Sequence, residues 1–134
     1  MKLVVDTGVF SASLSRRRLP SASPYLEMLS GHQLFLASVT VAELRFGALV
    51  AGWGESRRLR LEQGIESTTV IPVTDALLTE IASFRFACRQ AGHPLADRIH
   101  ANDLWIAASA IHIGAGLVTG DAVFAAAPGL SVVE

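Results

Sequence analysis

The stretch Lys2-Leu3-Val4-Val5-Asp6-Thr7-Gly8 decides the fold class of this sequence. Its apolar residues, two of them β-branched, are typical of a short buried strand, and an acid followed closely by glycine ends that strand. Four later stretches have the same apolar character and are predicted as strands: residues 33–37, 68–73, 116–119 and 130–133.

Helical patterns fill the segments between these strands. The clearest follows Thr74, a predicted N-cap, and its apolar residues recur at the helical period: Leu77, Ile81, Phe84 and Cys88. Further helices are predicted from Val9 onward and over residues 40–50, 55–66 and 103–113, the last capped by Asn102. Strands that alternate with helices imply a three-layer α/β/α sandwich with a central parallel sheet of four to five strands.

Length and composition exclude several classes of protein. A chain of 134 residues forms one domain, residues 1–134, and its hydrophobic fraction of 51% excludes a disordered protein. The single cysteine excludes a disulfide framework and a multi-cysteine zinc module. Only three consecutive apolar residues precede the acid Asp6, too few for the apolar core of a signal peptide. No apolar stretch reaches the ~20 residues of a membrane span. We therefore expect a cytoplasmic protein.

Charge is balanced overall but distributed unevenly. Eleven basic and twelve acidic residues give a net charge of −1, which by itself does not indicate nucleic-acid binding. Residues 1–67 carry eight basic and six acidic side chains (net +2), whereas residues 68–134 carry three basic and six acidic side chains (net −3).

Four acidic residues fall where a parallel sheet binds its ligands. Asp6 ends the first predicted strand, and Asp121 follows the fourth. Asp103 opens the helix before that fourth strand, and Glu43 lies in the first turn of the helix after the second. Because ligands bind outside the carboxyl ends of parallel strands, we expect these four carboxylates at one rim of the sheet.

Carboxylates held this close together need a counter-charge. Each pair repels by about 4 kcal/mol at 4 Å and an effective dielectric constant of ~20. Such a cluster either shifts its pKa values or holds a cation, and oxygen ligands suit Mg²⁺ or Mn²⁺. Metal-assisted hydrolysis of a phosphodiester is the chemistry that needs this arrangement.

Each acid also has a structural interpretation. Thr40 and Glu43 fit a capping box, Asp103 suits the first turn of a helix, and Asp121 fits a turn. Asp6 is the exception, since an acid that ends an apolar strand has little structural purpose. Taken together at one rim, the four acids favour a functional site.

At these residues the sequence resembles the PIN-domain ribonucleases, and specifically the VapC-type toxins of bacterial toxin–antitoxin pairs. The resemblance spans essentially the whole chain and rests on four stretches in the order of the family: VVDTGVF (4–10), SVTVAEL (38–44) with Gly47, DLWIAA (103–108) and LVTGD (117–121). It implies a PIN-like α/β/α fold, in agreement with the pattern of strands and helices.

The resemblance also implies a site and a reaction. The metal-binding and catalytic positions match Asp6, Glu43, Asp103 and Asp121, and supporting hydroxyl positions match Thr7 and Thr119. Val123 stands where many members have a further acid, which leaves open whether one or two ions bind. The implied activity is that of an Mg²⁺-dependent (or Mn²⁺-dependent) endoribonuclease. The resemblance also implies a homodimer and a VapB-type antitoxin as partner.

Other interpretations remain open from the sequence. Arg16, Arg17 and Arg18 are candidates to bind RNA phosphates, although an arginine run is also typical of a solvated loop. A PIN-like domain that binds RNA or protein without catalysis is one alternative function. A receiver-type signalling domain is another, but it would need a lysine at a late strand end, and Lys2 is the only lysine.

Overall fold

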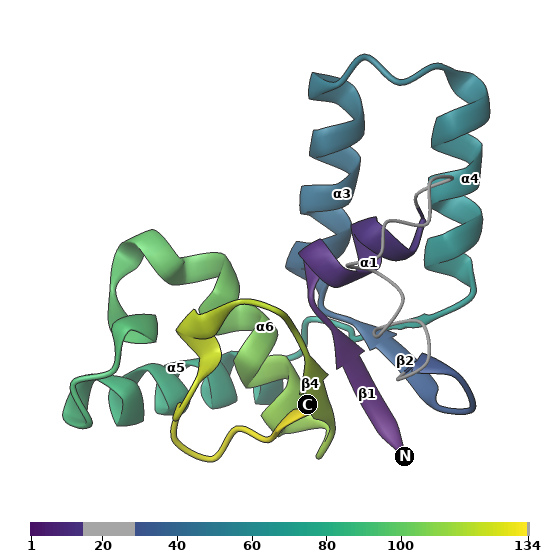
Figure 1. Cartoon of the computed structure of the whole chain (residues 1–134). Coiled ribbons are helices and arrows are strands. Elements are labelled where there is room, and N and C mark those ends of the chain that lie inside the picture. Colours follow the sequence, from purple (N-terminus) through teal and green to yellow (C-terminus); the bar gives the residue numbers. More distant parts are fainter. Residues whose placement is uncertain (15–28, 134) are drawn as a thin grey trace.

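The computed structural model describes residues 1–14 and 29–133 (Figure 1). Within these residues, five parallel strands form one sheet in the order β3-β2-β1-β4-β5. The strands are β1 (Lys2–Val5), β2 (Gln33–Leu36), β3 (Thr69–Val70), β4 (Gly116–Val118) and β5 (Val132–Val133). The order reverses between β1 and β4, and the crevice beside such a switch point is where open parallel sheets bind ligands.

Helices connect the strands, as the alternation in the sequence predicts. The α-helices are α1 (Thr7–Ser13), α3 (Ser38–Val50), α4 (Glu55–Glu66), α5 (Asp75–Gln90) and α6 (Ala101–His112). The described residues also contain three short 3₁₀ helices: η1 (Pro94–Ala96) and η2 (Arg98–His100) between α5 and α6, and η3 (Ala122–Phe124) after β4. The predicted N-cap of α5 is confirmed, because the Thr74 hydroxyl accepts a 3.1 Å hydrogen bond from Leu77 N.

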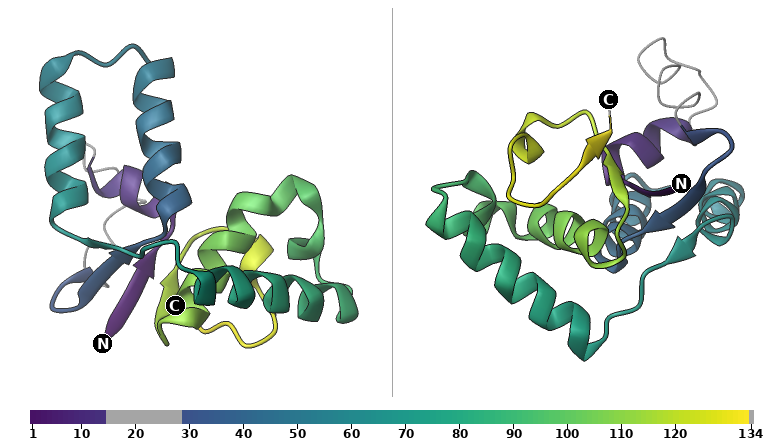
Figure 2. Two further views of the ribbon diagram at one scale, coloured as in Figure 1. Left: turned by 180° about the vertical axis from the view of Figure 1, so that it is seen from behind. Right: turned by 90° about the horizontal axis from the view of Figure 1, so that it is seen from below.

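Helices cover both faces of the sheet, so the predicted three-layer sandwich is confirmed (Figure 2). The side chains of β1 alternate between the two faces, since successive residues of a strand point to opposite sides. Leu3 and Val5 pack with residues of α1, α3 and α4. Val4 packs with residues of α5 and α6 on the other face.

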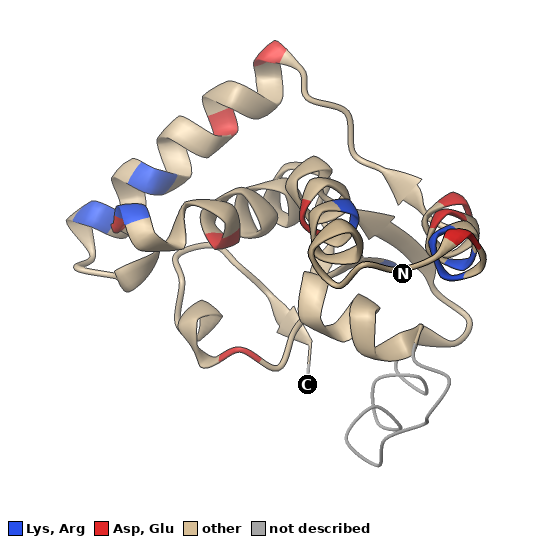
Figure 3. Ribbon diagram, turned by 90° about the horizontal axis from the view of Figure 1, so that it is seen from above, with Lys and Arg blue, Asp and Glu red and all other residues tan. Residues whose placement is uncertain are grey.

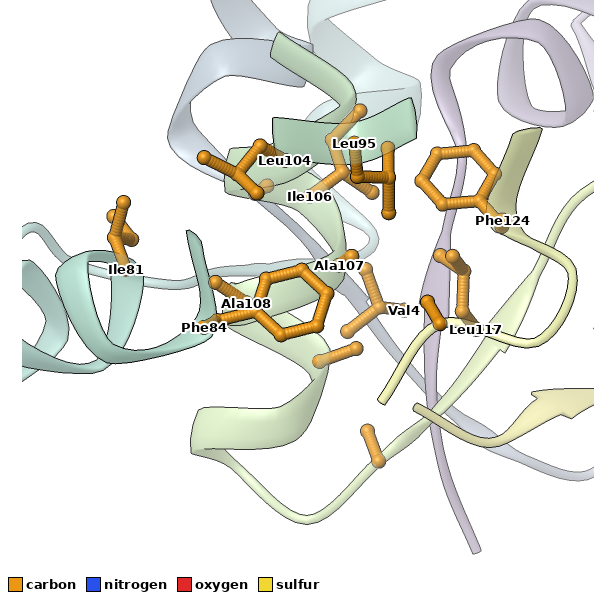
Figure 4. Close-up of a cluster of buried hydrophobic side chains, with 14 of the residues drawn as sticks. Val4, Ile81, Phe84, Leu95, Leu104, Ile106, Ala107, Ala108, Leu117 and Phe124 are labelled. Carbon is orange, nitrogen blue, oxygen red and sulfur yellow. The ribbon is translucent and has the colours of Figure 1, made fainter. Parts of the chain in front are cut away.

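The core on the α5–α6 face also fixes the loop that follows β4. Figure 4 shows Val4 of β1 and Leu117 of β4 beside Ala107 of α6 and Phe124 of η3. Phe124 is fully buried there. Burial of this ring anchors η3, and with it the acid that precedes η3, to the hydrophobic core.

Three helices begin two residues before their predicted starts. Helix α1 begins at Thr7 because Asp6 is its N-cap. Helix α6 begins at Ala101, so the prediction that Asn102 caps it is wrong. Asn102 lies inside the first turn, and no side chain caps this helix at its N-cap, His100.

The third strand is much shorter than predicted. Only Thr69 and Val70 pair with β2, whereas residues 68–73 were expected to form a strand. Ile71 N still donates a 2.9 Å hydrogen bond to Leu36 O. Pro72 follows, and because proline has no N–H to donate to the ladder, the strand stops before it.

The strand order also decides between two doubly wound folds. A receiver-type domain has the order 2-1-3-4-5, with the first strand second from the edge. Here the first strand is central, so the receiver-type alternative is wrong. In the described part of the chain, no helix combines the length and the apolar character that crossing a membrane requires.

Candidate active site

A pocket of about 700 Å³ opens at the carboxyl ends of β1 and β4. All four acids singled out from the sequence line it, each from a different stretch of the chain: Asp6, Glu43, Asp103 and Asp121. Thr7 of α1 lies in the same wall. The topology therefore brings together residues from four separate stretches of the chain.

Asp6 is the most buried of the four acids, with 9% of its surface exposed. Its Oδ1 accepts a 2.8 Å hydrogen bond from Thr7 N, and its Oδ2 accepts a 2.7 Å bond from Thr119 Oγ1. Burial raises the pKa of Asp6, the charges of Asp103 and Asp121 raise it further, and the two hydrogen bonds lower it. The expectation that Asp6 has little structural purpose is wrong, since it caps α1.

Glu43 does not take part in a capping box. Helix α3 begins at Ser38 and its N-cap, Ala37, makes no side-chain cap, so Thr40 is already the third residue of the helix. The Glu43 carboxylate instead lies 3.1 Å from Thr7 Oγ1. Contact with another element, not closure of its own helix, determines where this side chain lies.

A buried hydroxyl that the sequence reasoning missed supports this contact. Thr40 is fully buried, and its Oγ1 lies 3.1 Å from Thr7 Oγ1. A hydroxyl has one proton and a carboxylate only accepts, so Thr7 donates to Glu43 and Thr40 donates to Thr7. One feature of the sequence could have predicted this contact: Thr40 and Glu43 are three positions apart, which places both on one face of α3.

Asp103 lies in the first turn of α6, where the helix dipole favours a negative charge. His100 Nδ1 is 3.4 Å from Asp103 Oδ2. Burial raises the pKa of Asp103 and the charge of Asp121 adds to the increase, whereas His100 lowers it. The structural and functional interpretations of this residue are therefore compatible.

Asp121 has a local role that matches its structural interpretation. Its Oδ1 accepts a 3.0 Å hydrogen bond from Val123 N, which makes it the N-cap of η3. Its own N–H donates a 3.0 Å bond to Thr119 Oγ1, the same oxygen that donates to Asp6. Thr119 therefore joins two of the acids, and the half-buried Val123 packs against the core.

The donor chemistry of the pocket fits a hard divalent cation, because carboxylate and hydroxyl oxygens are the ligands that Mg²⁺ and Mn²⁺ prefer. Across residues 1–14 and 29–133, no three acidic, histidine or cysteine side chains converge on a single metal-binding point. Each carboxylate contacts a hydroxyl, an imidazole or a backbone N–H instead. These contacts fix the carboxylates in the wall of one pocket.

Figure 3 shows acidic positions on α3, on α6 and after β4, basic positions at the outer end of α5, and positions of both signs on α4. The Arg16–Arg18 segment, predicted to bind RNA phosphates, lies outside the residues that the structure describes.

Comparison with known proteins identifies close relatives of the chain. The PIN domain family model matches residues 3–130. Ribonuclease VapC5 of Mycobacterium tuberculosis is 35% identical over 133 residues, which cover 98% of this chain and 91% of the relative. Ribonuclease VapC4 of the same organism is 29% identical over 134 residues, which cover 98% of this chain and 95% of the relative.

Solved structures share the fold over nearly the whole chain. VapBC-5 of M. tuberculosis, a member of the VapBC family of toxin–antitoxin systems, is 32% identical with a TM-score of 0.62, covering 99% of this chain and 95% of that one. VapBC2 of Rickettsia felis, bound to a DNA fragment from its promoter, gives a TM-score of 0.80 at 24% identity, covering 99% and 98%. The predicted PIN-like fold is confirmed.

Proposed function

We propose that this chain, which belongs to the PIN-domain family and within it to the VapC ribonucleases, is the endoribonuclease toxin of a type II toxin–antitoxin pair. Its reaction is the hydrolysis of phosphodiester bonds in RNA. Residues 1–134 form a single PIN domain in this proposal, and the protein works in the cytoplasm, where its RNA substrates are.

One observation carries the proposal: four carboxylates from separate stretches of the chain surround one pocket at the switch point of the sheet. Burial raises the pKa of Asp6, and the charges of Asp103 and Asp121 raise it further. Perturbed acids in a cleft are typical of functional sites. The supporting hydrogen bonds of Thr7 and Thr119 fit the same interpretation.

PIN-domain ribonucleases are metal-dependent in general, and we assign Mg²⁺ or Mn²⁺ to this pocket. Its acidic donors are the four carboxylates already described, and Val123 adds none. A bound divalent ion supplies Lewis-acid activation of the phosphate and a lower pKa for water.

The chain's own residues prepare the pocket for this role. Thr119 and the Thr7 backbone N–H fix both oxygens of Asp6 and favour its ionised form. Thr40 and Thr7 fix Glu43 through the hydroxyl chain. Four negative charges around one pocket repel an RNA phosphate, so a counter-charge is a condition for substrate binding.

The proposed partners are a VapB-type antitoxin and a second copy of the chain. Related structures contain VapBC toxin–antitoxin complexes. Large apolar side chains also project from the α3–α4 hairpin, including Phe46 (68% exposed) and Leu49 (65% exposed). Such exposure is typical of surfaces that a partner covers.

Cleavage of total cellular RNA by the antitoxin-free protein tests the proposal. We expect discrete cleavage products with Mg²⁺ or Mn²⁺, none in EDTA, and recovery when the metal is restored. Cleavage that persists in EDTA would contradict the metal site. Complete absence of cleavage by a folded, metal-loaded protein would favour the alternative of a PIN-like domain that only binds RNA or protein.

A further inference from the structure

A second groove, of about 800 Å³, lies between α5 and the segment formed by η2 and α6. Its wall includes Arg85, Phe86 and Arg89 from α5, Arg98 from η2, and Leu104 and Trp105 from α6. We name it the α5–α6 groove. It is separate from the acid pocket, and none of the four acids lines it.

Positive charge gathers in this groove from a part of the chain that is acidic overall. Residues 68–134 contain three basic side chains, and all three line the groove: Arg85, Arg89 and Arg98. None of them forms an ion pair within the described residues, and Asp97 is the one acid of the lining. Figure 3 shows these basic positions at the outer end of α5 and beside it.

Aromatic side chains lie between these arginines. Phe86 is 60% exposed although it belongs to the amphipathic helix α5, whose buried face carries other residues. Trp105 is half-buried in the opposite wall. Arginines outside any ion pair can contact phosphates, and accessible aromatic surface can stack on bases. These are the two elements of a site for single-stranded nucleic acid.

Helix α6 joins the groove to the acid pocket. Asp103 lines the pocket, and the next two residues, Leu104 and Trp105, line the groove. The first turn of α6 therefore supplies Asp103 to the pocket and Leu104 to the groove, so both sites take residues from the same turn. His100 of η2 adds a 3.4 Å contact with Asp103.

We propose that the α5–α6 groove binds a single-stranded segment of the RNA substrate next to the bond that is cut. Arg89 and Arg98 contact its phosphates, and Phe86 and Trp105 stack on its bases. Arg85 is tied to the wall, since its Nε donates a 3.3 Å hydrogen bond to Ala96 O. The inference rests on the ribonuclease proposed above, but binding in this groove does not require catalysis.

Binding of a short fluorescein-labelled single-stranded RNA of mixed sequence, measured by anisotropy in EDTA at several salt concentrations, tests the groove without cleavage. The double variant Arg89→Ala/Arg98→Ala removes two exposed charges of the groove. We expect about ten-fold weaker binding. The slope of log affinity against log salt concentration (the salt slope) should become shallower by about 1.4, the value for two lost phosphate contacts on a single strand. Arg89→Lys/Arg98→Lys should restore the slope.

The matched control is Arg57→Ala/Arg58→Ala, which removes two exposed charges of α4 outside the groove and should leave affinity and slope near the wild-type values. Phe86→Ala should weaken binding about five-fold or more without a change of slope. With Mg²⁺ present, the groove variants should raise KM for RNA and leave kcat unchanged. The Mg²⁺ concentration that gives half-maximal cleavage (the Mg²⁺ midpoint) should also stay the same.

Equal effects of the groove and control variants would overturn the proposal. So would dissociation of a dimer by the groove variants without loss of RNA binding, because the groove would then be an interface between copies. If the wild-type protein bound RNA through the groove but did not cut it, the ribonuclease proposal would be wrong. The proposal that the α5–α6 groove binds RNA would still hold.

Discussion

Thr119 Oγ1 donates a 2.7 Å hydrogen bond to Asp6 Oδ2 across 113 positions of sequence. The same oxygen accepts a 3.0 Å bond from Asp121 N, so one hydroxyl positions a carboxylate at the end of β1 and the turn that follows β4. These strands are neighbours at the switch point of the sheet. The contact therefore links the topology of the fold to the geometry of the proposed site.

Replacing Thr119 with valine keeps the shape and removes the hydroxyl. Asp6 then loses a bond that lowers its pKa, and Asp121 N loses its acceptor. We expect the free energy of unfolding to fall by about 1–3 kcal/mol and the Mg²⁺ midpoint for cleavage to rise. Urea melts and Mg²⁺ titrations measure the two effects, and Thr119→Ser should restore both. An unchanged Mg²⁺ midpoint in Thr119→Val would contradict the positioning role.

Thr40→Val tests the hydroxyl chain to Glu43. Valine fits the buried position but leaves Thr7 without the donor that orients its own hydroxyl toward Glu43. We expect a stability loss of about 1 kcal/mol and a higher Mg²⁺ midpoint for cleavage. Thr40→Ser should recover both. If Thr40→Ser behaved like Thr40→Val, the methyl group rather than the hydroxyl would be the important feature.

The pH dependence of stability reports the cost of holding a charged carboxylate at the buried position of Asp6, to which the charges of Asp103 and Asp121 add. Its pKa is raised in the folded state, so its contribution to stability is full where it is protonated and is lost as pH rises through that raised pKa. In metal-free buffer at neutral pH, Asp6→Asn should therefore melt a few degrees above the wild type. The difference should shrink as the pH falls toward the pKa of Asp6. A lower melting temperature at every pH would mean that the cap on α1 dominates.

Phe124→Ala tests the connection between the core and the loop that carries Asp121. Phe124 is fully buried, and truncating such a ring costs about 3–5 kcal/mol of stability. Because η3 would lose its anchor, we also expect a higher Mg²⁺ midpoint in the folded protein. Phe86→Ala is the matched control for stability, since that ring is largely exposed and its loss should cost little. A wild-type Mg²⁺ midpoint in folded Phe124→Ala would contradict this connection, because the site would then not depend on burial of Phe124.

The sequence was sufficient to predict the strands that position the site. The apolar run before Asp6 and the similar run before Asp121 could be placed because burial on both faces demands such residues. The rule that ligands bind at the carboxyl ends of strands then brought the acids to one rim. The resemblance to VapC proteins identified the same residues independently.

Local geometry was less predictable. The start of α3 depends on the extended backbone at Ala37, which has no side chain to signal a cap. The contact of Thr40 with Thr7 depends on how α1 and α3 pack, and no periodicity within either helix contains that information. The early end of β3 follows from a proline whose effect depends on which neighbour the strand pairs with.

RNA cleavage by Asp6→Asn, beside Asp75→Asn as a matched control, tests the central claim most directly. Asp75 is an exposed acid in the first turn of α5 and lies outside the pocket. With both variants shown to be folded, we predict that Asp6→Asn binds Mg²⁺ more weakly and cleaves RNA orders of magnitude more slowly. Asp75→Asn should keep wild-type cleavage at the same Mg²⁺ concentration. Full Mg²⁺-dependent cleavage by folded Asp6→Asn would contradict the proposed site.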